Sequence, residues 1–185
     1  MANADTPRGL RPIGSLNGSP YNGATIKCAI LAGDGTATFI GDAVKLDGTA
    51  SADGYYPSVV QAAATDEIFG VVTSFDANPD ALSDQYRKAT TLRLCNVVPA
   101  LDTLFVIQVS GTFAITDVGE AADITVGSGN TTTGMSAMEL EATPGTEDQV
   151  LILGIDRRPD NEVGAFADVI VRINESSLRG DGTPI

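Results

Sequence analysis

The sequence contains no histidine and no tryptophan, and each absence removes a class of function. Histidine is the one side chain that ordinarily titrates near neutral pH and is the commonest transition-metal ligand, so acid–base and metal-assisted hydrolysis are disfavoured. Glycosidases use paired carboxylates, for which Asp66 with Glu67 and Glu139 with Glu141 are the candidates, but the missing tryptophan leaves little aromatic platform for a sugar. We therefore predict that the chain is not an enzyme and carries no cofactor.

Basic residues are also scarce. There are 11 Lys and Arg residues against 24 Asp and Glu, which gives a net charge of -13 and a pI of about 4.1. A negative field of this size repels phosphates, so nucleic acid is not expected as a partner. The same field keeps copies soluble and apart until a shaped surface, or a basic patch on a partner, overcomes the repulsion.

Long apolar runs and cysteines are few. No segment reaches the roughly 18 consecutive apolar residues of a membrane span, so no membrane partner is expected. The two cysteines, Cys28 and Cys95, lie in apolar, β-like segments and are expected to be reduced thiols in the core. The first residues lack the basic and apolar regions of a secretory signal, and we expect no export.

Short apolar and β-branched segments, bounded by Gly, Asp, Asn or Pro, recur at the spacing of sandwiches and barrels. Strands are expected at 24–31, 38–46, 56–64, 67–75, 86–98, 104–109, 113–116, 124–126, 135–140, 150–155 and 169–173. Between them, 127–134 and 142–148 are typical of loops, and 80–88 is equally compatible with one helical turn or none. Recurring Asp-Gly pairs indicate turns, with a weak surface calcium site as the alternative.

Residues 1–23 differ from the rest because they are rich in Pro, Gly and Asn and lack apolar periodicity. We predict an extended N-terminal arm over 1–23 and one all-β domain over 24–185, either a single β-barrel or a jelly-roll-like sandwich. Apart from Asp5, the only charged side chains of the arm are Arg8 and Arg11, which make it locally basic. Its spaced apolar residues are suited to shallow grooves of a neighbouring subunit; they include Leu10, Ile13 and Tyr21.

A second unusual segment is GIDRRPDNEVG, residues 154–164, in which Arg157 and Arg158 stand together in an acidic protein. Their guanidinium groups can bind carboxylates in a bidentate manner. Two alternatives stay open: pairing within the loop, to Asp160 and Glu162, or pairing across a subunit boundary.

Three stretches together resemble the structural cement, or head decoration, proteins of tailed bacteriophages. They are LRPIGSLNGSPYNG (10–23), TATFIGDAVKLDGTA followed by QAAATDEIFGVVTSF (36–50 and 61–75), and GIDRRPDNEVG with the later DVIVRIN (154–164 and 168–174). The resemblance runs over nearly the whole chain, although none of the motifs is catalytic. It implies a β-rich homotrimer on the capsid exterior of the virion, assembled in the host cytoplasm and bound to the major capsid protein.

On this basis the expected function is that of a capsid cement protein, which stabilises junctions between coat subunits. The expected contact residues are Arg8, Leu10, Arg11, Ile13, Tyr21, Arg157 and Arg158. The alternative is a carbohydrate- or host-binding module on the virion surface. That function needs an aromatic-lined groove, for which Tyr55 and Tyr56 are the candidates.

Overall fold

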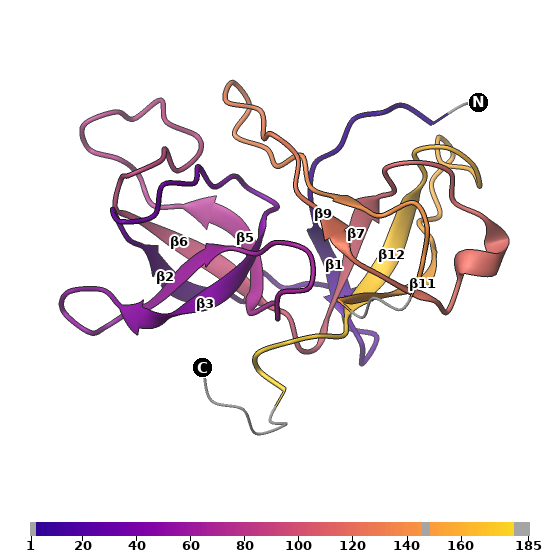
Figure 1. Ribbon diagram of the computed structural model, residues 1–185, viewed down its shortest axis with the longest axis horizontal. Coiled ribbons are helices and arrows are strands. Elements are labelled where there is room, and N and C mark those ends of the chain that lie inside the picture. Colours follow the sequence, from indigo (N-terminus) through magenta and orange to yellow (C-terminus); the bar gives the residue numbers. More distant parts are fainter. Residues whose placement is uncertain (1–2, 146–148, 180–185) are drawn as a thin grey trace.

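The computed structural model describes residues 3–145 and 149–179, and it contains two β bodies that lie side by side (Figure 1). One is a closed five-stranded barrel, and the other is a five-stranded sheet with a small two-stranded sheet beside it. The prediction of an all-β fold of the barrel or sandwich type is therefore confirmed.

The barrel is built from the first half of the chain. Its strands are β2 (Ile26–Ile30), β3 (Ala43–Ala50), β4 (Pro57–Gln61), β5 (Gly70–Phe75) and β6 (Arg93–Pro99), in the order β2-β4-β3-β5-β6. Neighbouring strands are antiparallel except β2 and β4, which are parallel. Inside the barrel, Cys28 faces Cys95 across β2 and β6 as free, buried thiols. Burial raises the pKa of each to about 12, so both remain protonated and behave as small apolar side chains.

The second body is a sheet in the order β1-β7-β12-β11-β8. Its strands are β1 (Arg11–Ser15), β7 (Thr103–Gln108), β12 (Asp168–Ile173), β11 (Val150–Ile155) and β8 (Ala121–Ala122). Beside it, β9 (Ile124–Thr125) pairs with β10 (Glu139–Leu140), and η1 (Ile115–Asp117) is a single 3-10 turn. In β12 the residues Val169, Val171 and Ile173 are buried and alternate with less buried neighbours, the period of two expected for a strand with one face in the core.

The two bodies share one core. The larger cluster of buried hydrophobic residues includes Ala43, Val71 and Val98 from the barrel together with Phe105 and Val171 from the sheet. The barrel and the sheet are therefore packed as one unit.

Several expectations about local structure need correction or completion. Of the strand expected at 135–140 only Glu139–Leu140 forms, and β6 begins at Arg93 rather than at 86. Residues 113–116 were expected as a strand, but η1 forms there because Asp117 Oδ2 accepts a hydrogen bond from Ala114 N at 2.7 Å. Within 80–88 the chain makes turns and no helix. Part of loop 142–148 lies outside the described residues, namely 146–148.

The N-terminal segment, expected as an arm, is extended but contributes to the sheet. Strand β1 pairs antiparallel with β7, from Arg11 opposite Val106 to Ser15 opposite Thr103. As a boundary between domains, the division at residue 23 stays a prediction.

The described residues contain neither a membrane-spanning helix nor a cluster of metal ligands. No helix there combines the length and the apolar character required to cross a membrane. Likewise, over 3–145 and 149–179 no group of three or more Cys, Asp or Glu side chains is arranged to hold a metal ion.

Candidate functional site

Residues 3–10 lie across the end of the sheet and are fixed by two amide side chains. The Asn3 side chain donates to the carbonyl oxygens of Glu162 and Ala165, both at 2.8 Å, and accepts from Glu162 N at 3.0 Å. Gln108, on β7, accepts from Thr6 N at 3.0 Å and donates to Ala4 O at 2.9 Å. The segment is thereby held against loop 156–168.

Loop 156–168 is closed by Asn161. Its side-chain amide donates to the carbonyl oxygens of Asp156 and Asp168 at 2.8 Å, and its oxygen accepts from Asp168 N at 3.0 Å. Arg158 reinforces the closure, because Nε lies 3.2 Å from Asp156 Oδ2 and a terminal nitrogen bonds Asp168 Oδ2. The loop therefore has a defined shape on which side chains are positioned.

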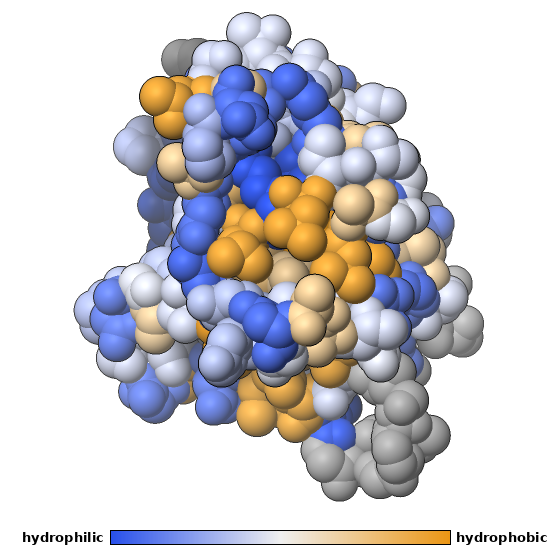
Figure 2. All heavy atoms as spheres, turned by 90° about the vertical axis from the view of Figure 1, so that its left-hand side faces the viewer, coloured by the Kyte–Doolittle hydropathy of each residue, from blue (hydrophilic) through white to orange (hydrophobic). Residues whose placement is uncertain are grey.

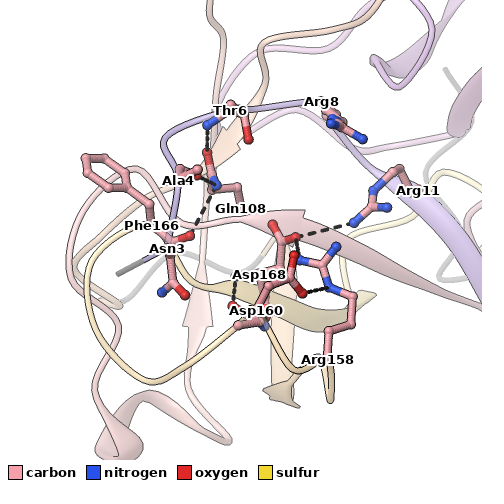
Figure 3. A pocket seen from close by; sticks show the side chains of 12 residues that line it. Asn3, Ala4, Thr6, Arg8, Arg11, Gln108, Arg158, Asp160, Phe166 and Asp168 are labelled. Carbon is pink, nitrogen blue, oxygen red and sulfur yellow. Dashed lines mark hydrogen bonds and ion pairs between the residues drawn. The ribbon is translucent and has the colours of Figure 1, made fainter. Parts of the chain in front are cut away.

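Between the N-terminal segment and this loop lies a polar hollow of about 220 Å³, which we call the arginine cleft (Figure 3). It is lined by Asn3, Ala4, Thr6, Arg8, Gly9, Arg11, Gln108, Arg158, Asp160, Asn161, Phe166 and Asp168. Arg8 and Arg11 come from the N-terminal segment and Arg158 from the loop, with Asp168 between them. Three of the seven predicted contact residues, two from the N-terminal segment and one from loop 156–168, thus line one hollow.

A second hollow, of about 370 Å³, is mainly apolar and also includes residues of loop 156–168. We call it the apolar groove; it is lined by Phe113, Ile115, Val118, Leu153, Gly154, Ile155, Arg157, Val163 and Ile170. Four of these side chains are strongly exposed: Ile115 by 75%, Val118 by 45%, Leu153 by 42% and Val163 by 46%. Large apolar side chains gathered in this way on a surface are typical of protein-binding sites.

A β-bulge places Leu153 in the groove. In the β11–β12 register Ile152 faces Val171 and Gly154 faces Ile170, so Leu153 is the extra, unpaired residue. Gly154 has φ of 153°, which a residue with a side chain rarely adopts. An isolated Gly within the apolar run VLILGI is the one sequence signal that could have indicated this bulge.

The apolar residues predicted in the arm have different environments. Leu10 is 1% exposed and belongs to the shared core, so its side chain is not at the surface of this chain. Ile13, on β1, is 41% exposed and available for contact. Tyr21 is half-buried against the core, and this burial raises its pKa while a hydrogen bond with Thr73 opposes the rise.

Arg157 and Arg158 point to different surfaces. Arg158 pairs within its own loop, with Asp156, Asp160 and Asp168, so internal pairing holds for this residue. Arg157 lines the apolar groove and makes no ion pair with any residue in 3–145 or 149–179. Of these two arginines, Arg157 is therefore the one that presents a guanidinium without an ion-pair partner in the described residues, beside apolar side chains.

The barrel end of the molecule carries further exposed hydrophobic residues. Leu82 is 81%, Leu92 58% and Ile26 39% exposed, and Figure 2 shows hydrophobic side chains gathered near the middle of this end among hydrophilic ones. Tyr55, in the β3–β4 hairpin, is 79% exposed, and its ring lies 6.5 Å from that of Tyr56 in an edge-to-face arrangement. These two tyrosines line neither the arginine cleft nor the apolar groove.

The carboxylate pairs considered for glycoside hydrolysis are placed elsewhere too. Asp66 accepts hydrogen bonds from Lys45 Nζ and Ala63 N, both at 2.8 Å, and so stabilises a turn. Glu139, on β10, has its pKa raised by burial and, to a lesser extent, by the charge of Asp5. Neither Glu67 nor Glu141 lines the cleft or the groove.

Comparison of the chain with protein-family models, with curated proteins and with solved structures found no match. The resemblance to phage cement proteins accordingly stays a prediction from the sequence. The proposal of a function below therefore depends on the arginine cleft and the apolar groove.

Proposed function

We propose that this protein is a capsid cement protein, which binds the outside of a tailed-phage head and links neighbouring subunits of the major capsid protein. The observation that carries the proposal is the apolar groove, where Ile115, Leu153 and Val163 are exposed around one hollow. An adhesive protein needs such a surface, because burying apolar area drives most protein association. The resemblance of the sequence to cement proteins supplies the identity of the partner.

The groove is built on a rigid support. Leu153 belongs to β11, which pairs with β12, and the bulge fixes its outward direction. Side chains that are already positioned lose little conformational entropy on binding, which favours affinity. Arg157 at the groove provides a cation that can pair with a coat-subunit carboxylate and set the orientation.

A trimer of this protein would hold several coat subunits at once. After the first contact forms, the remaining ones become intramolecular, and the overall affinity exceeds that of any one contact by orders of magnitude. The net charge of -13 keeps free copies apart in solution until they meet the shell. In this mechanism the protein reinforces junctions between capsomers by adhesion alone.

The test is binding of purified protein to expanded heads that lack it, measured by co-sedimentation and by mass of the particles. Leu153→Asp places a charge in the groove, and we expect at least about a tenfold loss of affinity, as for a central interface residue. The matched control is Leu82→Asp, because Leu82 is also exposed but lies in a barrel loop. Circular dichroism establishes that both variants are folded.

Three outcomes would contradict the proposal. The first is failure of the wild-type protein to bind heads. The second is an equal loss of affinity for heads in the Leu153→Asp and Leu82→Asp variants. The third is undiminished binding of the Leu153→Asp variant to heads.

A further inference from the structure

Some arginine N–H groups in the arginine cleft have no hydrogen-bond acceptor among the described residues. Asp168 accepts from both Arg11, at 3.4 Å, and Arg158, and the latter is also paired with Asp156. Arg8 is exposed at the edge of the cleft and makes no ion pair with any described residue. The five N–H donors of Arg8 are therefore available to a ligand from outside the chain. Arg11 has one long contact, to Asp168, and its other N–H donors are available as well.

The charge of the lining indicates the charge of that ligand. Three arginines, Arg8, Arg11 and Arg158, line the cleft with two carboxylates, Asp160 and Asp168, and Asp156 pairs with Arg158 from outside the lining. Arg8 is the lining arginine that pairs with none of these carboxylates, so the unpaired excess is its single positive charge. A group with a single negative charge neutralises this excess. A phosphate, with about -1.5 to -2 charges at neutral pH, would place surplus negative charge beside two carboxylates in an acidic protein.

Among ligand groups with one negative charge, the geometry of the cleft favours a carboxylate. Arginine presents a planar fork of donors that matches the two oxygens of a carboxylate. In the cleft a single oxygen of Asp168, Oδ2, already accepts from both Arg11 and Arg158. In Figure 3, Arg8 and Arg11 stand together on one side of the cleft, and the ring of Phe166 lies on the opposite side. A second carboxylate can therefore enter from solvent on the side of Arg8.

We propose that the arginine cleft binds a carboxylate of a partner protein, with Arg8 and Arg11 as the receiving residues. This inference rests on the proposed function for the source of the carboxylate, which is a coat subunit. The site is organised in advance, because Asn3 and Gln108 fix the segment that carries both arginines. Binding therefore requires ordering of two side chains rather than of a whole segment.

The site is tested on the full chain by NMR titration at low salt, observing the arginine side-chain N–H signals. The probe is the peptide acetyl-Gly-Asp-Gly-amide, and acetyl-Gly-Asn-Gly-amide is its uncharged equivalent. We expect saturable shifts of the Arg8 and Arg11 signals with the first peptide only. Arg8→Gln should weaken this binding at least about tenfold, as expected for hydrogen bonds to a charged group.

The control variant is Arg179→Gln, which removes the same charge from an exposed arginine that makes no ion pair with a described residue and lines neither the arginine cleft nor the apolar groove. It should bind the Asp peptide as the wild type does. Equal shifts with both peptides, equal losses of peptide affinity in Arg8→Gln and Arg179→Gln, or tighter binding of inorganic phosphate than of the Asp peptide would each overturn the proposal.

Binding to heads separates this proposal from the proposed function. If wild type binds heads, Arg8→Gln should bind them more weakly, and undiminished binding would refute the coat subunit as the source of the carboxylate. If wild type fails to bind heads but the peptide titration succeeds, the proposed function is wrong and the carboxylate site stands. If wild type binds heads and the titration fails, the carboxylate site is wrong.

Discussion

At the scale of single residues, Arg87 stands out because all of its hydrogen-bond donors are satisfied within the chain. It is completely buried, and all five of its N–H donors have acceptors. Nε donates to Thr91 O at 2.8 Å, one terminal nitrogen bonds Leu31 O at 2.6 Å and Asp34 O at 2.9 Å, and the other bonds Asp34 Oδ2 at 3.2 Å and Thr36 O. Arg87 thus fastens the segment before β6 to the loop after β2.

Replacing Arg87 by methionine should destabilise the protein by about 3–5 kcal/mol, because Asp34 and several carbonyl oxygens lose their donors in a buried place. The matched control is Lys88→Met at the next position. Lys88 is half exposed and pairs with Asp84 at 2.7 Å, so we expect only a small change there. Urea denaturation measures both, and a similar stability of the two variants would show that the Arg87 network contributes little.

The sequence could not assign these roles to individual arginines. It marked Arg8, Arg11, Arg157 and Arg158 as unusual in an acidic chain, and three of them do meet in one cleft. Nothing in the sequence distinguishes Arg87, because four of its five hydrogen bonds go to backbone carbonyl oxygens, which leave no pattern in the side chains. Predicting such a residue requires knowledge of which loops meet in space.

At the scale of secondary structure elements, β1 and the two-residue β8 are strands that the sequence did not predict, and β1 is the longer of the two. Its sequence RPIGS contains Pro12 and Gly14, residues that weaken a strand, and no alternation of apolar residues. It forms because it is the edge strand of the sheet, where proline is tolerated, and because its partner β7 is a strong apolar strand. A pairing between Arg11 and Val106 depends on the tertiary fold and has no local signal.

Leu10 and Ile13 offer a test of how this segment contributes. Leu10→Ala removes a side chain that is 1% exposed, and we expect a loss of about 2–5 kcal/mol in the free energy of unfolding. Ile13→Ala changes a side chain that is 41% exposed, so its stability should remain within about 0.5 kcal/mol of wild type. Chemical denaturation distinguishes the two, and a stable Leu10→Ala variant would mean that the segment is an independent arm.

Strands with regular apolar runs were predictable in contrast. Residues 150–155 form β11 with the expected bounds, and β12 differs from the expectation by one residue at its start. The prediction of a strand at 113–116 was wrong, because a turn stabilised by Asp117 competes locally with a strand. Periodicity therefore identified the interior of both bodies, and the surface turns and edge strands required the three-dimensional structure.

At the scale of the whole molecule, contacts other than the shared core also join the barrel to the sheet. Gln149, next to β11, donates to Ala63 O and Asp66 O of the barrel, both at 2.8 Å, and accepts from Ile124 N at 3.0 Å. Ile68 N, before β5, donates to Glu175 O at 2.9 Å, after β12. Polar groups of each body are thus hydrogen-bonded to groups of the other body.

We expect the chain to unfold in one cooperative transition despite its two β bodies. Differential scanning calorimetry should give a calorimetric enthalpy equal to the van't Hoff enthalpy, the property of a two-state system. A barrel that melts separately from the sheet would produce two transitions, and that result would show that the shared core does not couple them.

The β3–β4 hairpin has a practical consequence for anyone who wishes to label this protein. Its tip is closed by Gly54 N donating to Ser51 O at 2.7 Å, and it projects from the barrel with Tyr55 largely in solvent. Exposed loop tips accept insertions well. An epitope or fluorophore-binding tag grafted after Asp53 would be carried on a stalk remote from the arginines of the N-terminal segment, and would leave their chemistry intact.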